Sequence, residues 1–177
     1  FTPGHTWALT GGPHSAWGPD GALAAVDFAP MSISSGCVPS DEWIVSAAPG
    51  LVVRSENGAV IVDLDGDGRE QTGWVLLYMH VGRENRVSVG TFLDQDDPIG
   101  HPSCEGGVST GTHVHLARKY NGEWILADGP MPMNLSGWIA HAGSKLYEGT
   151  MTKDDKTVFS SVYGSFESRI KRENGDV

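Results

Sequence analysis

Short apolar segments separated by turn residues are the feature of this sequence that most constrains its fold. The segments are rich in Val and Ile and only a few residues long, and Gly, Pro, Asp and Asn stand between them. The 177 residues include 24 Gly and 10 Pro. Strands have this length and composition, whereas a helix needs a longer repeat of apolar residues with a period of about 3.6. The sequence therefore predicts a mainly β fold.

Turn signals divide the chain into successive strand candidates. Asn57-Gly58 and Asn121-Gly122 are typical of two-residue hairpin turns, and a further hairpin is expected around Lys153–Lys156. Residues 1–22 and 128–141 are rich in Gly, Pro and polar residues, so we expect them to be irregular. The expected strands are 23–29, 43–48, 51–55, 59–64, 74–81, 112–120 and 123–126.

The chain has the length of one ordinary domain. Its hydrophobic content of 39% and its six Trp are sufficient for a packed core. Neither an internal repeat nor a linker divides the sequence. We therefore expect a single domain over residues 1–177, with its core at about 11–141 and with 142–177 as a C-terminal extension packed on that core.

The net charge of −10 argues against two classes of partner. An acidic surface repels both nucleic acid and anionic membranes, so we expect neither as a partner. No apolar stretch approaches the ~20 residues that span a bilayer. The first residue is Phe1 rather than Met, which is compatible with removal of a leader or pro-segment. The simplest interpretation of the charge is a solvated surface that carries no message about substrate.

Cys37 and Cys104 are the two cysteines of the chain, and they permit one disulfide. Such a bond would stabilise the fold by roughly 4 kcal/mol on the chain-entropy model. Two free buried thiols are the alternative. A disulfide would imply that the protein works outside the reducing cytosol.

A His-x-His motif is the first candidate for chemistry. His113 and His115 lie in an alternating segment, and residues two apart on a strand point to the same face, roughly 6.5–7 Å apart. Both imidazoles could bind one metal, or one could bind while the other handles protons; two surface histidines are the alternative. The preceding segment, 103–111, contains three glycines that allow the backbone to approach a ligand closely.

Further ligands are needed, because a catalytic zinc usually has three protein ligands and one open position. His14 follows Gly11-Gly12-Pro13 in a candidate loop, and Asp27 lies in an apolar strand. A buried Asp is costly unless it is hydrogen-bonded or bound to metal. Asp20 is the rival carboxylate, but its Pro-Asp-Gly context is typical of a turn. His80 ends a strongly apolar run and is a candidate catalytic or supporting residue.

Three other histidines and two tryptophans are further candidates for site residues. His5, His101 and His141 lie in Gly/Pro-rich loops without a paired polar residue at strand spacing, so we expect them to be exposed. Trp17 and Trp138 lie in expected loops that flank the site, and they are candidates for lining a substrate groove; burial in the core is the alternative.

Asp63, Asp65 and Asp67, followed by Gly68, resemble the first half of a calcium-binding loop. The twelfth position is Trp74 rather than the Glu that closes such loops. The segment also lies between two expected strands, where Asp and Gly make good turns. A structural Ca²⁺ and a simple hairpin turn both remain open.

These histidines, Asp27 and the segments around them carry a resemblance to a known family. The sequence resembles the lysostaphin/LytM-type zinc endopeptidases, most closely the LasA (staphylolysin) and β-lytic branch, over roughly residues 11–140. Thr112 and Val114 are two mild departures, since the family usually has Pro and Leu at these positions. The cysteine that pairs with Cys104 is a third difference, because its usual position has moved to Cys37. The matching stretches are His14 with Asp27 before Phe28-Ala29-Pro30, Tyr78-Met79-His80, the block from Cys104-Glu-Gly-Gly to His113-Val-His115, and Tyr120-Asn121-Gly122.

The resemblance implies a central antiparallel sheet with long loops that form an active-site groove. It implies a secreted bacterial zinc metalloendopeptidase, expected to be a monomer, that hydrolyses peptide bonds of peptidoglycan cross-links at glycine-containing sites. Tyr147 is the candidate for the family's late-chain tyrosine, which would bind substrate. The implied zinc ligands are His14, Asp27 and His115, and the implied catalytic pair is His80 and His113.

This set of residues suits hydrolysis. A zinc ion held by two neutral imidazoles and one carboxylate lowers the pKa of bound water towards ~7. His80 and His113 would orient that water, move its proton and stabilise the oxyanion.

Two other functions are compatible with the sequence. One is a catalytically inactive LytM-like domain that binds wall peptides or regulates another wall hydrolase. Such degenerate members usually lose a ligand, whereas every expected position is filled here. The other is a β-domain that binds a sugar or small molecule and carries its histidines incidentally.

Overall fold

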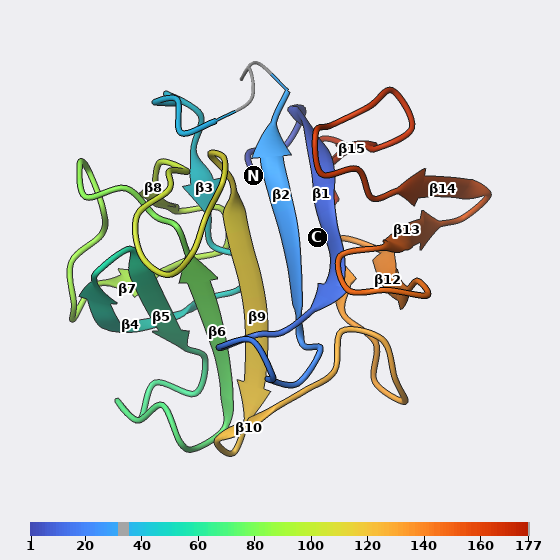
Figure 1. Cartoon of the computed structure of the whole chain (residues 1–177). Coiled ribbons are helices and arrows are strands. Elements are labelled where there is room, and N and C mark those ends of the chain that lie inside the picture. The colour runs from blue at the N-terminus through green and yellow to red at the C-terminus, as the bar shows by residue number, and fades with distance from the viewer. Residues whose placement is uncertain (32–35, 177) are drawn as a thin grey trace.

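The computed structural model describes residues 1–31 and 36–176, and over these residues the chain consists of strands and loops without a helix (Figure 1). The predicted β fold is confirmed. The strands are β1 (Thr6–His14), β2 (Ala25–Pro30), β3 (Ile44–Val45), β4 (Gly50–Glu56), β5 (Ala59–Asp63), β6 (Trp74–Met79), β7 (Phe92–Leu93), β8 (Pro98–Gly100), β9 (Val114–Tyr120), β10 (Glu123–Trp124), β11 (Asn134–Leu135), β12 (Trp138–Ala142), β13 (Gly149–Lys153), β14 (Lys156–Phe159) and β15 (Arg169–Lys171).

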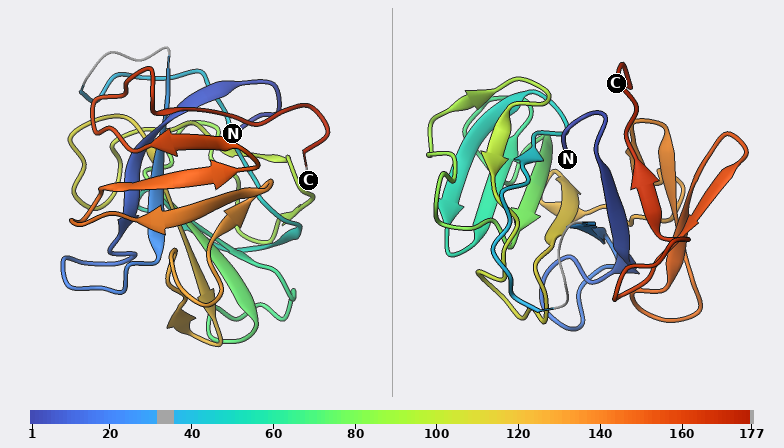
Figure 2. Two further views of the ribbon diagram at one scale, coloured as in Figure 1. Left: turned by 90° about the vertical axis from the view of Figure 1, so that its right-hand side faces the viewer. Right: turned by 90° about the horizontal axis from the view of Figure 1, so that it is seen from above.

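The largest sheet is antiparallel and contains nine strands in the order β15-β1-β2-β9-β6-β5-β4-β7, with β10 paired to β9. A second sheet has the order β11-β12-β13-β14 and covers one side of the molecule (Figure 2). A small third sheet pairs β3 with β8. The segment after residue 142 thus supplies two strands to the second sheet and the edge strand β15 to the largest one.

The central strands β2 and β9 are buried on both faces. Val26 and Leu116 point into the larger core cluster, whereas Ala25 and Ala117 point into a smaller cluster on the opposite face. Side chains alternate along a strand, so the odd-numbered positions share the face with the small alanines. This face leaves room for the larger polar side chains described below.

Both predicted hairpin turns are present. Asn57-Gly58 joins β4 to β5 and Asn121-Gly122 joins β9 to β10, and all four residues have positive φ. Asn-Gly tolerates this conformation, which matches the twist of the flanking strands. The expected hairpin near the C-terminus is also confirmed, because Lys153 pairs with Lys156 across β13 and β14.

Two predictions of irregular structure are wrong. Residues 1–22 contain β1, and residues 128–141 contain β11 and most of β12. Strand β1 was hidden because Gly11-Gly12-Pro13 interrupts its apolar pattern, and its pairing with β2 has two register shifts in this region. In the second segment the strands are short and are joined by a tight turn at Ser136-Gly137, both of which have positive φ.

The predicted disulfide between Cys37 and Cys104 is confirmed, with the Cα atoms 5.6 Å apart. It ties the segment that begins at Gly36 to the glycine-rich loop before His113. Thr112 strengthens this connection, since its backbone N–H donates to the carbonyl oxygen of Gly36 at 3.0 Å. A separate finding is that the described part of the chain has no helix long and apolar enough to cross a membrane.

Candidate metal centre

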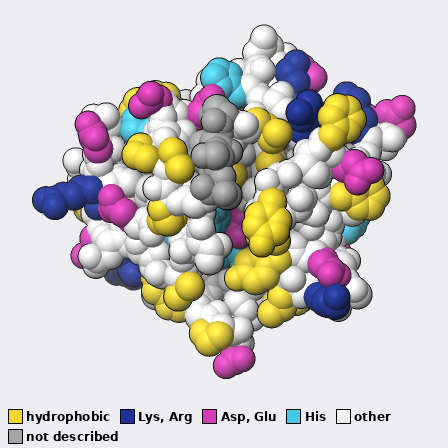
Figure 3. All heavy atoms as spheres, turned by 45° about the horizontal axis from the view of Figure 1, so that its top comes forward, with side chains coloured by type: hydrophobic (Ala, Val, Ile, Leu, Met, Phe, Trp, Pro, Cys, Tyr) yellow, Lys and Arg dark blue, Asp and Glu magenta, His cyan; other side chains and the backbone are white. Residues whose placement is uncertain are grey.

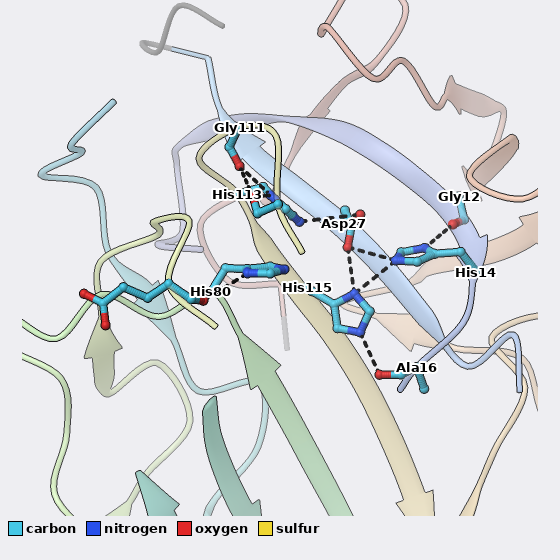
Figure 4. A network of polar contacts seen from close by, with 10 residues as sticks. Gly12, His14, Ala16, Asp27, His80, Gly111, His113 and His115 are labelled. Atoms are coloured by element: carbon cyan, nitrogen blue, oxygen red, sulfur yellow. Dashed lines mark hydrogen bonds and ion pairs between the residues drawn. The ribbon is translucent and has the colours of Figure 1, made fainter. Parts of the chain in front are cut away.

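Three neighbouring strands of the largest sheet bring the predicted ligands together (Figure 4). His115 on β9 is directly opposite Asp27 on β2, and on its other side it is opposite Met79 at the end of β6. His14 is the last residue of β1, the strand next to β2. The site therefore depends on the register of β1, β2 and β9.

The three side chains converge through one atom each. His14 Nε2 lies 3.0 Å from His115 Nδ1, and the Asp27 Oδ1 atom lies 3.2 Å and 3.1 Å from these two nitrogens. The residues are only 2%, 8% and 6% exposed, in the order His14, His115 and Asp27. A tetrahedral zinc with bonds of ~2.0–2.1 Å holds its ligand atoms about 3.3 Å apart, so the spacing fits such an ion.

Backbone carbonyls determine which nitrogen of each imidazole faces the centre. His14 Nδ1 donates to the carbonyl oxygen of Gly12 at 2.8 Å, and His115 Nε2 donates to that of Ala16 at 3.1 Å. A carbonyl only accepts, so each of these nitrogens carries its hydrogen. In the neutral rings the other nitrogens present lone pairs to each other and to Asp27. The two lone pairs and the carboxylate oxygen repel one another at these distances, and a cation bound between them removes the repulsion.

The pKa values reflect the same requirement for positive charge. Burial by itself would raise the pKa of Asp27, but hydrogen bonds from His115 and His14, made when the nitrogens that face Asp27 are protonated, hold it far below its usual range. Burial would lower the pKa of His14, but the hydrogen bond and the charge of Asp27 raise it above its usual value. In the absence of metal a proton on His14 supplies the charge, so metal and proton compete for the same site.

His80 and His113 form a second pair beside the three predicted ligands. Their ring centroids are 4.4 Å apart. His113 Nδ1 donates to the carbonyl oxygen of Gly111 at 2.7 Å, and His80 Nδ1 donates to that of Glu105 at 3.0 Å. Each Nε2 is therefore free to accept a proton, and that of His113 is 3.7 Å from Asp27 Oδ2. Both rings point their free nitrogens toward the centre (Figure 4).

Burial, followed by the charge of His113, lowers the pKa of His80 to about 4. The residue is consequently neutral near pH 7. Its backbone has a φ of 63°, a left-handed conformation that costs roughly 1–3 kcal/mol for such a residue. Ser103 holds this conformation, because its backbone N–H and its hydroxyl both donate to the His80 carbonyl, at 2.7 and 2.9 Å.

Two glycines on β1 allow the strands to approach this closely. A Cβ atom on Gly11 would lie 2.7 Å from Asp27 Oδ2, and one on Gly12 would lie 2.7 Å from the backbone of Glu148. The sequence analysis predicted neither these roles of the two glycines nor the four backbone carbonyls that orient the histidine rings. The Gly-Gly pair before His14 was the available signal for the first; backbone carbonyls leave no signal in the sequence.

Tyr147 lies next to the centre, and both Tyr147 and Trp17 are substantially exposed, at 46% and 52%. The Tyr147 ring stacks on His14 with centroids 4.2 Å apart, and burial together with the charge of Asp27 raises its pKa. Trp17 directly follows Ala16, whose carbonyl caps His115. Trp138 is different: it is buried in the core, and its indole N–H donates to the Lys171 carbonyl. The structure does not bring it to the histidines.

The space-filling view shows a hollow on this face of the molecule (Figure 3). Histidine and acidic side chains are visible at its floor, and large hydrophobic side chains stand along one rim. The centre is therefore reached from the surface, although its ligands are almost fully buried.

The remaining histidines take no part in the centre. His5 is exposed, as expected, whereas His101 and His141 are only half-buried rather than exposed. His101 packs on Trp43, and His141 hydrogen-bonds to Thr152. Asp20, the rival carboxylate, is exposed in a turn.

The acidic loop after β5 supports the turn interpretation and not the calcium interpretation. Oxygens of Asp63, Asp65 and Asp67 lie within 4.8 Å of one another. Asp63, however, accepts the backbone N–H of Gly68 at 2.8 Å, and both Asp65 and Asp67 accept the N–H two residues further on. These carboxylates hold the turn in the way that Asp commonly does.

Comparisons with known proteins identify the fold. No family model matches the sequence, and no curated protein matches it. Among solved structures, an M23 metalloprotease described as pseudoalterin from the deep sea matches over 90% of this chain and 92% of its own, with 20% identity and a TM-score of 0.70.

Two further structures match more loosely. A mutant catalytic domain of the prophage-encoded M23 protein EnpA from Enterococcus faecalis has 19% identity, covers 73% of this chain and 94% of its own, and gives a TM-score of 0.47. The protein LytU has 24% identity, with coverages of 72% and 84% and a TM-score of 0.45. On the evidence of the first match, the chain has the fold of an M23 metalloprotease.

Proposed function

We propose that this chain is a secreted bacterial zinc metalloendopeptidase that hydrolyses peptide bonds in peptidoglycan cross-links, at glycine-containing sites. The observation that carries the proposal is the convergence of two imidazole lone pairs and one carboxylate oxygen within 3.2 Å of one another. A cluster built only for stability would not aim three electron-rich atoms at one point. The similarity in fold to an M23 metalloprotease supports the same conclusion.

His14, Asp27 and His115 would hold the metal. Two nitrogens and one oxygen are donors that zinc prefers, and three protein ligands leave a fourth position open, as in catalytic sites. Bound zinc supplies Lewis acidity, which polarises a carbonyl and lowers the pKa of water. The carbonyls of Gly12 and Ala16 orient the two ligand rings before any metal binds.

His80 and His113 would act on protons. Each ring is held by a backbone carbonyl at Nδ1 and offers its Nε2 to the centre. The lowered pKa of His80 keeps it neutral near pH 7, so its Nε2 can accept a hydrogen bond from water. After accepting a proton, the same ring donates to negative charge that develops on the substrate oxygen.

The choice of substrate rests on the surroundings of the centre and on the resemblance to lysostaphin-type enzymes. Tyr147 offers exposed aromatic surface beside His14, and the exposed Trp17 follows the residue whose carbonyl contacts His115, so a peptide backbone could lie against these rings. Glycine has no side chain to meet these rings. The disulfide between Cys37 and Cys104 favours an extracellular location. We infer a monomer that works on wall peptides.

The metal content of the purified protein and its cleavage of cell walls test the proposal together. We expect one zinc per chain and clearing of a wall suspension, and His115→Ala should abolish both. His113→Ala should retain zinc and lose rate by about 10²–10⁴-fold, because it removes a proton-transfer group and no ligand. Loss of zinc in His113→Ala with retention in His115→Ala would reverse the assignment of the two residues.

Stoichiometric zinc without cleavage of walls or of a soluble glycine peptide would identify the chain as an inactive domain that binds wall peptides or regulates another hydrolase. Absence of bound zinc after dialysis against zinc buffer would contradict the metal assignment itself.

A further inference from the structure

A pocket of about 250 Å³ lies between the second sheet and the edge strand β15. Lys153 and Lys156 line it from the β13–β14 hairpin, and Arg169 and Lys171 line it from β15. Trp138 and Glu173 contribute to the same lining. Four cations thus surround one small pocket in a protein whose net charge is −10 and whose Lys and Arg number only 12.

The strand pattern places these cations together. Arg169 and Lys171 are two residues apart on β15 and share a face, while Ile170 between them is buried in the core. Lys153 and Lys156 are direct cross-strand partners. Like charges in such a pair destabilise a hairpin, so this placement needs a compensating anion.

Part of that compensation comes from the protein. Lys153 pairs with Asp176 and Lys171 pairs with Glu173, both at 2.7 Å. Within the described part of the chain, Lys156 and Arg169 have no carboxylate within 4.0 Å. Among the described residues, Lys156 and Arg169 can therefore bind an anionic ligand, whereas Lys153 and Lys171 are already paired with carboxylates.

The floor of the pocket is apolar. Trp138 and Val158 are both buried, and the Trp138 indole N–H is already used by the Lys171 carbonyl. An apolar floor with a cationic rim suits a ligand in which anionic groups alternate with short carbon segments. Arg presents a planar fork and Lys a point charge, and both bind phosphate oxygens well.

We propose that this pocket is an accessory binding site for a polyol phosphate polymer, with consecutive phosphodiesters on Lys156 and Arg169 and the polyol segment over Trp138. A base-paired nucleic acid is too wide for a pocket of about 250 Å³. Binding here depends on neither the metal nor the proposed peptidase activity.

The pocket and the metal centre lie at opposite ends of one strand. Gly149, the first residue of β13, packs against Pro13 beside His14, and Lys153 is the last residue of β13. Four steps along a strand span about 13 Å. A polymer attached to a wall could therefore be held at the pocket while a nearby peptide lies at the centre.

The test is calorimetric titration of the zinc-loaded full chain with inorganic phosphate and with a glycerol phosphate oligomer, at low and moderate salt. We expect the oligomer to bind more tightly than phosphate and to shift the NMR signal of the Trp138 indole N–H, which Trp138→Phe identifies by its loss. Lys156→Gln and Arg169→Gln should each weaken oligomer binding about tenfold and reduce the salt dependence by about one charge.

Arg69→Gln is the matched control, because Arg69 is exposed in the turn after β5 and the substitution removes the same charge. The oligomer affinity of this variant should stay within about twofold of that of the parent. Circular dichroism would verify that the variants are folded. Unchanged affinity in both pocket variants, or an equal loss in Arg69→Gln, would overturn the site. Equal or tighter binding of inorganic phosphate, of polyglutamate or of single-stranded DNA would overturn the assigned ligand.

Discussion

Gly11→Ala is the substitution that most directly tests how the fold positions the metal centre. Gly11 faces Asp27 across the β1–β2 pair, and its φ is not in the left-handed region. The backbone can therefore accept alanine, and the effect of the change comes from the new methyl group alone. That group would lie 2.7 Å from Asp27 Oδ2 and 3.1 Å from the Cβ and Cγ atoms of the same side chain.

The magnitude follows from these distances. Ordinary contacts of a Cβ atom begin at 3.4 Å, so either the carboxylate or strand β1 must move by about 0.7 Å. Overpacking of this kind costs about 1–3 kcal/mol of stability. Displacement of a ligand by a neighbouring residue typically weakens a metal site by about 10–100-fold. We expect zinc affinity to fall within that range, since His14 lies on the same strand as the added methyl group.

Competition for zinc with a chromophoric chelator measures the affinity, and thermal unfolding of the metal-free protein measures the stability separately. Gly129→Ala is the control, because its Cβ would make an ordinary contact of 3.5 Å with Leu126. Parental zinc affinity in Gly11→Ala would refute the argument that the space beside Asp27 is needed by its carboxylate. A loss of stability together with parental zinc affinity would show that the strain is relieved away from Asp27 and His14.

Three further predictions concern the bridge, a buried tyrosine and pH. Replacing Cys37 and Cys104 by Ser should lower the free energy of unfolding by up to about 4 kcal/mol, measured in urea against the parent with and without reductant; an equal midpoint in all samples would contradict it. Burial raises the pKa of Tyr78 to about 12, so stability should fall as pH rises from 10 through 12, and Tyr78→Phe should remove that fall while leaving the Ala47 N–H without its acceptor. Zinc affinity should decrease as pH falls through the pKa of His14, which Asp27 raises above the usual 6.5; titrations that are independent of pH would exclude His14 as a ligand.

The sequence predicted those features whose cause is local. The Asn57-Gly58 turn follows from backbone preferences of two residues, and the alternation around His115 follows from the two faces of a strand. Both were found in the structure. The closeness of His14 and His115 is different, since it depends on β1 lying next to β2, and nothing near His14 encodes that neighbour. The resemblance to known endopeptidases, rather than the periodicity of the sequence, predicted that His14 and His115 belong to one site.

What could not be predicted is mostly set by tertiary packing. Strand β1 carries Gly11-Gly12-Pro13, which local propensity assigns to a loop, yet the close approach of Asp27 and Glu148 requires the small residues there. The irregular composition around Trp138 predicts a loop beside the groove, but Trp138 begins β12, which pairs with β13, and its side chain is buried. Contacts between distant segments decided both cases.

Four imidazoles of the site are all oriented by main-chain oxygens, those of Gly12, Ala16, Glu105 and Gly111. A main-chain oxygen is present whatever side chain its residue carries. Positions such as Ala16 and Glu105 can therefore change during evolution without loss of the tautomers on which the chemistry depends, provided that the loop path is kept. The orientation of these four rings is in this sense encoded by the path of the loops rather than by residue identity.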